Sequence, residues 1–106
     1  MIRICINRNS QGQIYGFRAL NHGNNIVCAG VSTLVFNTVN SIETFTEEVM
    51  SVDKPQEGSG YIELYMPDIE AGHDNRDVCL LLSSMLLGIE NIRNQHPTQI
   101  TIDDRD

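Results

Sequence analysis

The sequence NHGNNIVCAGVS, residues 21–32, decides the fold, because the spacing of apolar side chains changes within it. Before it, apolar residues alternate with polar ones, as in half-buried strands. After it, apolar residues recur at steps of three and four, which predicts an amphipathic helix of about six turns. Asn24 or Asn25 is its natural N-cap, since an Asn oxygen accepts an otherwise unpaired backbone N–H. The expected apolar stripe comprises Val27, Val31, Leu34, Ile42, Phe45 and Val49, with Val35 and Val39 beside it.

Toward the N-terminus, two alternating stretches predict a β-hairpin. The first strand begins at Ile2, with isoleucine at every second position through Ile6. Residues 9–12, Asn-Ser-Gln-Gly, form the expected turn, because Asn and Gly tolerate positive φ. The second strand covers residues 13–20 and leads into the polar loop that contains His22.

Toward the C-terminus, the pattern predicts a loop over 53–60, a third strand over 61–66, and a polar irregular stretch over 67–75. A second helix then begins within 74–77 and runs to about Gln95, with Pro97 marking its end. Residues 99–102 form a short last strand, and 103–106 are expected to be a frayed tail. The expected core stripe of this helix is Val78, Leu81, Leu82, Met85, Ile89 and Ile92.

These elements predict one small α/β (α+β) domain over residues 1–106, in the order ββαβαβ. The expected architecture is a mainly antiparallel four-stranded sheet covered by two helices. The hydrophobic fraction of 41% is near that of globular proteins, which argues against wholesale disorder.

Charge and composition exclude several classes of function. The formal net charge of -7 argues against direct nucleic-acid binding, which needs clustered Lys and Arg. An acidic surface suits a basic partner, although it also serves plain solubility. We expect neither a signal peptide nor a membrane span, since the longest apolar-leaning run, 26–36, is far shorter than the ~20 residues a span requires. Three cysteines at unrelated spacings form no disulfide framework, which favours a reducing cytoplasm.

The three thiols are not equivalent. Cys79 lies among apolar residues at the start of the second helix and is expected to pack in the core. Cys5 lies on the less apolar face of the first strand, with no His near it in sequence. Cys28, by contrast, is the third helical residue if Asn25 is the cap, where free N–H groups and the helix dipole stabilise a thiolate.

His22, six positions before Cys28, is the candidate base. A polar loop would bring its imidazole over the helix start to form a thiolate–imidazolium pair, and N–H groups near Cys28 would bind an oxyanion. The alternative is that Cys28 is a small core residue and His22 fills a turn. His73 and His96 are interpreted as solvated loop and helix-end residues. Because His22, Cys28 and His73 lack a ligand spacing, no metal or cofactor is expected.

Residues 21–32 also carry a resemblance to the ribosomal-processing cysteine protease (Prp) family. That family has Gly-His-Ala, a loop, and then Asp-Ile-Val-Cys-Ala-(Ala/Gly)-x-Ser at a helix start. The resemblance extends to the N-terminal hairpin, the Ser59-Gly60-Tyr61 strand entry, the helix sequence LSSMLLG at 82–88, and Pro97-x-Gln99-Ile100. It implies a homodimeric cysteine endopeptidase that removes an N-terminal extension from a large-subunit ribosomal protein. It places the nucleophile on Cys28 and the base on His22.

The resemblance also matches Ser32 to the family's serine, either near the site or in packing. Gly-His-Ala is Asn21-His22-Gly23 here, the family's Asp is Asn25, and the loop between His and Cys is shorter than in many members. These differences motivate an alternative function, a non-catalytic dimeric module that binds a ribosomal protein or an assembly factor. For the protease, the expected substrate is the N-terminal peptide of a basic ribosomal protein, with no nucleic acid or membrane involved.

Overall fold

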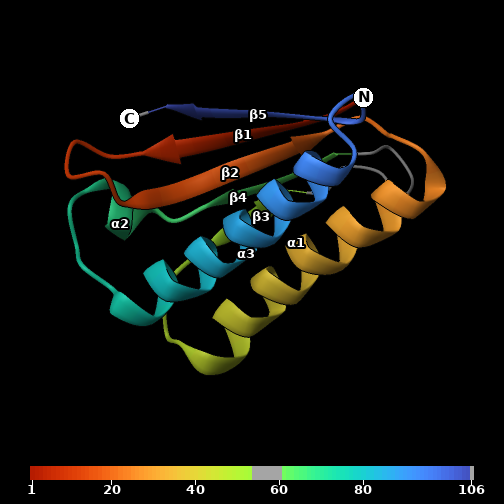
Figure 1. Ribbon diagram of the computed structural model, residues 1–106. Coiled ribbons are helices and arrows are strands. Elements are labelled where there is room, and N and C mark those ends of the chain that lie inside the picture. Colours follow the sequence, from red (N-terminus) through yellow and green to blue (C-terminus); the bar gives the residue numbers. More distant parts are fainter. Residues whose placement is uncertain (54–60, 106) are drawn as a thin grey trace.

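The N-terminal hairpin supplies two neighbouring strands of the sheet, and the second long helix connects the sheet to its last strand (Figure 1). The computed structural model describes residues 1–53 and 61–105. Their strands form a five-stranded sheet in the order β3-β4-β2-β1-β5, in which only the β1–β5 pairing is parallel. The elements in chain order are β1 (Ile2–Arg8), β2 (Ile14–Leu20), α1 (Asn25–Phe45), β3 (Ser51–Asp53), β4 (Tyr61–Tyr65), α2 (Pro67–Glu70), α3 (Arg76–Gln95) and β5 (Ile100–Arg105).

Both long helices pack side by side on one face of the sheet, and no helix of the described residues covers the opposite face (Figure 1). The predicted two-layer α+β architecture with a mainly antiparallel sheet is therefore confirmed. The core lies between the layers, because alternate residues of β1, β2 and β4 point toward the apolar stripes of α1 and α3. Its largest fully buried side chains are Phe17, Ile4, Ile6, Ile42, Leu64, Met66, Leu82, Met85, Ile89, Val27, Val35 and Val78.

The strand count was predicted as four, and the described residues contain five strands. The missed strand, β3, is three residues long and has every residue exposed, so it has no apolar alternation to detect. It pairs with β4 through backbone hydrogen bonds at the sheet edge. Asp53, expected in a loop, ends this strand; the remainder of that predicted loop, 54–60, lies outside the described residues. The stretch expected to be irregular contains the single-turn helix α2.

The first helix ends earlier than its apolar pattern predicts. Thr46 caps α1, because its backbone N–H and its hydroxyl both donate to the carbonyl of Ile42, at 3.1 and 2.7 Å. Phe45 and Val49, assigned to the buried stripe, are instead 73% and 61% exposed. The second long helix, α3, ends at Gln95 as predicted.

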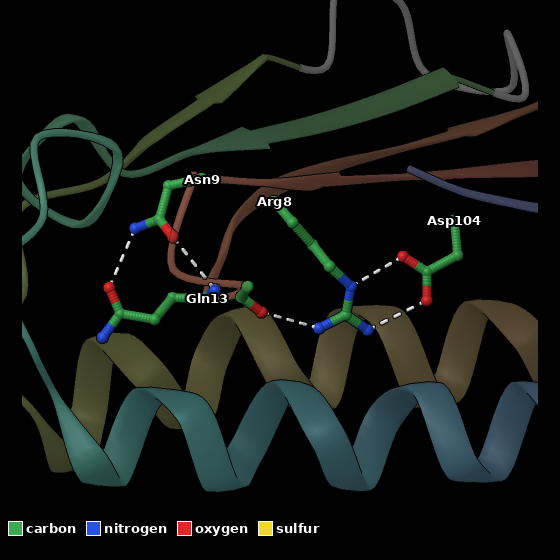
Figure 2. A network of polar contacts seen from close by, with 5 residues as sticks. Arg8, Asn9, Gln13 and Asp104 are labelled. Carbon is green, nitrogen blue, oxygen red and sulfur yellow. Dashed lines mark hydrogen bonds and ion pairs between the residues drawn. The ribbon is translucent and has the colours of Figure 1, made fainter. Parts of the chain in front are cut away.

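Residues 103–105 of the tail expected to fray form an ordered strand, and Asp106 lies outside the described residues. Residues 103–105 continue β5 beside β1. Arg8 holds Asp104 with two hydrogen bonds, Nε to Oδ1 at 2.7 Å and Nη2 to Oδ2 at 2.9 Å (Figure 2). This bidentate ion pair joins the two strands at the end of the sheet away from the His22 loop.

The hairpin turn is stabilised by the buried side chain of Asn9 (Figure 2). Its Oδ1 accepts the N–H of Gln13 at 3.0 Å, and its Nδ2 donates to Gln13 Oε1 at 2.8 Å. The same Nδ2 donates to the carbonyl of Ile69 at 2.7 Å, which ties the turn to α2. The predicted turn is confirmed, with Gly12 at φ 81.

Among the described residues, one helix, α1, is long and apolar enough to cross a membrane, with a mean hydropathy of 1.3 over its best window. Its apolar stretch is longer than the run noted in the sequence, but length and composition alone do not identify a span, so the expectation of no membrane span stays a prediction. Core helices share these properties, and α1 buries Val27, Val31, Val35, Thr38, Val39 and Ile42 against the sheet and α3. Ser, Thr and Asn fill much of its remaining surface.

Candidate active site

The start of α1 is capped by Asn24, the first of the two predicted candidates. Its Oδ1 accepts the backbone N–H of Val27 at 2.9 Å. The helix therefore begins at Asn25, and Cys28 is its fourth residue, not its third as predicted for an Asn25 cap. The N–H of Cys28 donates to the carbonyl of Asn24 at 2.9 Å, so it is not available to an oxyanion. The N–H groups of Asn25 and Ile26 belong to the first turn, which an α-helix leaves without intrahelical acceptors.

The Cys28 sulfur lies against the loop that precedes the helix. The backbone N–H of Gly23 donates to Cys28 Sγ at an N···S distance of 3.1 Å. The carbonyl oxygen of Gly23 is 3.5 Å from the same sulfur, and His22 Nδ1 is 4.0 Å from it. A thiol donates to the carbonyl or to the imidazole, whereas a thiolate accepts from the Gly23 N–H and from a protonated imidazole. The site can therefore hold both states of the sulfur.

His22 is placed over the helix start by a change in backbone direction. Asn21 adopts φ 70, a left-handed conformation that Asn tolerates better than most residues, between the end of β2 and His22. The carbonyl of His22 accepts from the Met1 nitrogen at 3.0 Å. His22 is exposed and Cys28 is half-buried, so a substrate can reach the pair from solvent. The structure thus brings together the two residues singled out from the sequence.

The remaining candidates lie elsewhere. Cys5 is 6% exposed in β1, and its side chain is on the sheet face opposite the helices. Cys79 was expected in the core but is exposed, because it follows the buried Val78 by about 100° around α3. His73 is exposed, His96 caps α3, and Ser32 is exposed one turn after Cys28. Within the described ranges, no group of three His, Cys, Asp or Glu could hold a metal ion.

Gln99 is a site neighbour to which sequence reasoning gave no role. Its Oε1 accepts the backbone N–H of Asn24 at 2.9 Å, directly behind the loop. Sequence separation hides this contact, because the two residues are 75 positions apart. The one feature of the sequence that pointed to Gln99 was its place in the Pro97-x-Gln99-Ile100 stretch of the family resemblance.

A surface hollow of about 520 Å³ borders the same loop at Asn21. Its lining includes Arg3 and Asp103, which form an ion pair with an N···O distance of 3.7 Å. The hollow lies at the start of β1 and beside β5, and it reaches the loop only at Asn21.

The family model described as "Cysteine protease Prp" matches residues 1–101. The chain belongs to this cysteine protease family. Ribosomal processing cysteine protease Prp from Staphylococcus aureus strain Mu50 is 27% identical over 96% of this chain and 97% of its own length. The Bacillus subtilis strain 168 protein of the same name is 25% identical, with 96% of each chain covered.

Solved structures of similar proteins share the fold. A crystal structure of the S. aureus Prp with a covalently linked product peptide superposes with a TM-score of 0.89 at 27% identity, covering 99% of this chain and all of that one. SMU.848 from Streptococcus mutans gives a TM-score of 0.81 at 27% identity, covering 98% and 96% of the two chains. The sequence-based assignment to the Prp family is confirmed.

Proposed function

We propose that this protein is an endopeptidase that removes the N-terminal extension of a large-subunit ribosomal protein during ribosome assembly, using Cys28 and His22 as a dyad. The observation that carries the proposal is the cluster around Cys28 Sγ, with the Gly23 N–H at 3.1 Å and His22 Nδ1 at 4.0 Å. Family membership supports peptide-bond hydrolysis, and the relatives named as ribosomal processing proteases support the substrate class.

The reaction begins when His22 takes the proton of the Cys28 thiol and the thiolate attacks the scissile carbonyl carbon. The carbon–nitrogen bond of the tetrahedral intermediate then breaks as His22 gives its proton to the leaving amine. A water molecule, deprotonated by His22, attacks the resulting thioester. This step releases the carboxylic acid product and returns the proton to the Cys28 thiolate, so that the dyad is regenerated.

The substrate is a peptide, as in the S. aureus structure that carries a covalently linked product peptide. Ribosomal proteins are basic because they bind RNA, and a chain with a net charge of -7 attracts a basic peptide. We also propose a cytoplasmic location, since its three cysteines are free and a reducing compartment keeps thiols in that state.

The test is intact-mass analysis of the ribosomal protein precursor with and without this enzyme. Wild-type enzyme is expected to convert the precursor to one shortened product. Cys28→Ser and His22→Gln are expected to leave it intact, whereas Cys79→Ser, which removes an exposed thiol far from the loop, retains full cleavage. Cleavage that survives Cys28→Ser would remove Cys28 from the nucleophile's role.

Alkylation separates this protease from a non-catalytic binding module. If Cys28 is the nucleophile, its sulfur reacts with iodoacetamide at a lower pH than Cys79 in the same molecule, because only the thiolate attacks. Peptide mass spectrometry reads the two sites in one experiment. Equal pH profiles, together with an intact precursor, would favour the binding module.

A homodimer is the second part of the proposal. The solvent side of α1 exposes Ile26 and Phe45, at 79% and 73%, and no charged residue lies between Arg18 and Glu43. Subunit contacts are depleted of charged residues, and this helix offers none before Glu43 while Ile26 is exposed at its start. Sedimentation at micromolar concentration is expected to show a dimer, and Ile26→Lys to shift it toward monomer. A wild-type chain that sediments only as monomer contradicts this part.

A further inference from the structure

Gln99 is fixed in place by its own backbone. It lies in the turn between α3 and β5, where its N–H donates to the carbonyl of His96 at 3.0 Å. Its carbonyl accepts the N–H of Ile2, at the start of β1, at 2.8 Å. The residue is therefore anchored to two elements of the core before its side chain makes any contact.

The side chain of Gln99 packs on the two loop residues that precede α1. Oε1 accepts the N–H of Asn24 at 2.9 Å. A Cβ at position 23 would stand 2.9 Å from the same Oε1 and 3.4 Å from Ile2 Cδ1, so Gly23 lies directly against both side chains. The Gly23–Asn24 segment is thus supported from behind by Gln99 and Ile2.

The front of that segment faces the sulfur. The Gly23 N–H points at Cys28 Sγ at 3.1 Å, and His22 is the next residue toward the N-terminus. Glycine has the widest backbone freedom of any residue, so this N–H keeps its direction only if its neighbours hold it. A backbone N–H donates more strongly to a thiolate than to a thiol, and a donor at this distance keeps the sulfur from turning away.

We propose that Gln99 is a positioning residue of the active site, which holds the Gly23–Asn24 segment so that the Gly23 N–H and His22 converge on Cys28 Sγ. The inference rests on the proposed role of Cys28 as nucleophile. It assigns to Gln99 a function in catalysis without contact with the substrate or the sulfur. Gln99 affects the reaction only by orienting the backbone N–H of Gly23 toward Cys28 Sγ.

The experiment compares Gln99→Leu, which has a similar size but no acceptor, with Gln99→Glu, which keeps an accepting oxygen. Gln95→Leu, on the exposed end of α3, is the matched control. For Gln99→Leu we expect kcat on the precursor peptide to fall about tenfold with KM little changed, as for the loss of one hydrogen bond that shapes the transition state. We also expect the pH profile of Cys28 alkylation to move to higher pH. Gln99→Glu is expected to recover most of kcat, and Gln95→Leu to match the wild type.

Three results would overturn the positioning role. The first is a Gln99→Leu enzyme with wild-type kcat and an unchanged alkylation profile. The second is a Gln99→Glu enzyme as impaired as Gln99→Leu. The third is a loss of kcat in Gln99→Leu that is fully accounted for by the fraction of unfolded enzyme, while the pH profile of Cys28 alkylation in the folded protein stays unchanged. Cleavage by Cys28→Ser would instead refute the proposed function, so the two failures are distinguishable.

Discussion

At position 24, one side-chain oxygen determines where α1 begins. Asn24 Oδ1 accepts the N–H of Val27, while Asn25 is an exposed residue of the first turn. Asn24→Ala is expected to lower the free energy of unfolding by about 1 kcal/mol, the usual cost of losing an N-cap. Asn25→Ala, its matched control, is expected to change it by less than about 0.5 kcal/mol. Urea denaturation measures both, and equal losses would contradict the assignment of the cap.

Some residues of the site could be predicted from the sequence, and others could not. Turn chemistry and the helical period narrowed the N-cap to two neighbouring asparagines. The expected helix start made Cys28 and His22 the candidates, and the resemblance placed the nucleophile and the base on the same two residues. The direction of the Gly23 N–H depends on tertiary geometry, so no spacing revealed it. Gln99 reaches the loop only because β5 pairs in parallel with β1, which brings the end of α3 back to the start of the sheet.

Gly88 of α3 lies directly against Leu34 of α1. A Cβ there would stand 2.9 Å from Leu34 Cδ1 and 3.1 Å from its Cδ2. Gly88→Val is expected to lower the free energy of unfolding by about 1–3 kcal/mol, because the helices must separate or Leu34 must leave its rotamer. Leu87→Val, a β-branched substitution at a residue 61% exposed, is the control and is expected to cost less than about 0.5 kcal/mol. Thermal or chemical denaturation compares them, and equal effects would place the helix contact elsewhere.

The link between β4 and α2 is sensitive to alkaline pH. The Tyr65 hydroxyl donates to Glu70 Oε1, and this hydrogen bond raises the pKa of Tyr65 above its ordinary value of 10.0. Because the bond needs the protonated phenol, its stabilisation is fully present below pH 10.0 and is lost as pH rises through the raised pKa. Glu70→Gln is expected to lower the pKa of Tyr65 toward the ordinary value.

NMR titration of labelled tyrosine rings measures this change residue by residue. Tyr61 is the internal control, because burial, followed by the charge of Glu63, raises its pKa without any contribution from Glu70. An unchanged Tyr65 titration in Glu70→Gln, or an equal shift at Tyr61, would show that the hydrogen bond is not the cause.

Helices and strands with a long apolar repeat could be predicted from the sequence. Element boundaries and short strands that depend on contacts with other elements could not. The two strands of the hairpin and α3 follow their patterns closely. In contrast, α1 ends where Thr46 captures the Ile42 carbonyl, although apolar residues continue in helical register to Val49. The strand β3 forms by pairing with the edge of β4. The strand β5 extends into charged residues because Arg8 binds Asp104. Each of these outcomes depends on a partner distant in sequence.

If the substrate is the proposed basic peptide, the charge of the whole molecule governs how quickly it arrives. A net charge of -7 on 106 residues attracts a cationic peptide over a distance set by the screening length, which falls from about 30 Å at 0.01 M salt to about 3 Å at 1 M. We therefore expect kcat/KM for a lysine-containing precursor peptide to fall about tenfold across this range. The matched control is the same peptide with each Lys outside the cleavage site replaced by Gln, for which kcat/KM should change little. Steady-state cleavage assays measure both peptides at constant pH. If the two peptides respond equally to salt, long-range attraction has no part in substrate choice, and recognition depends on contacts at the His22 loop alone.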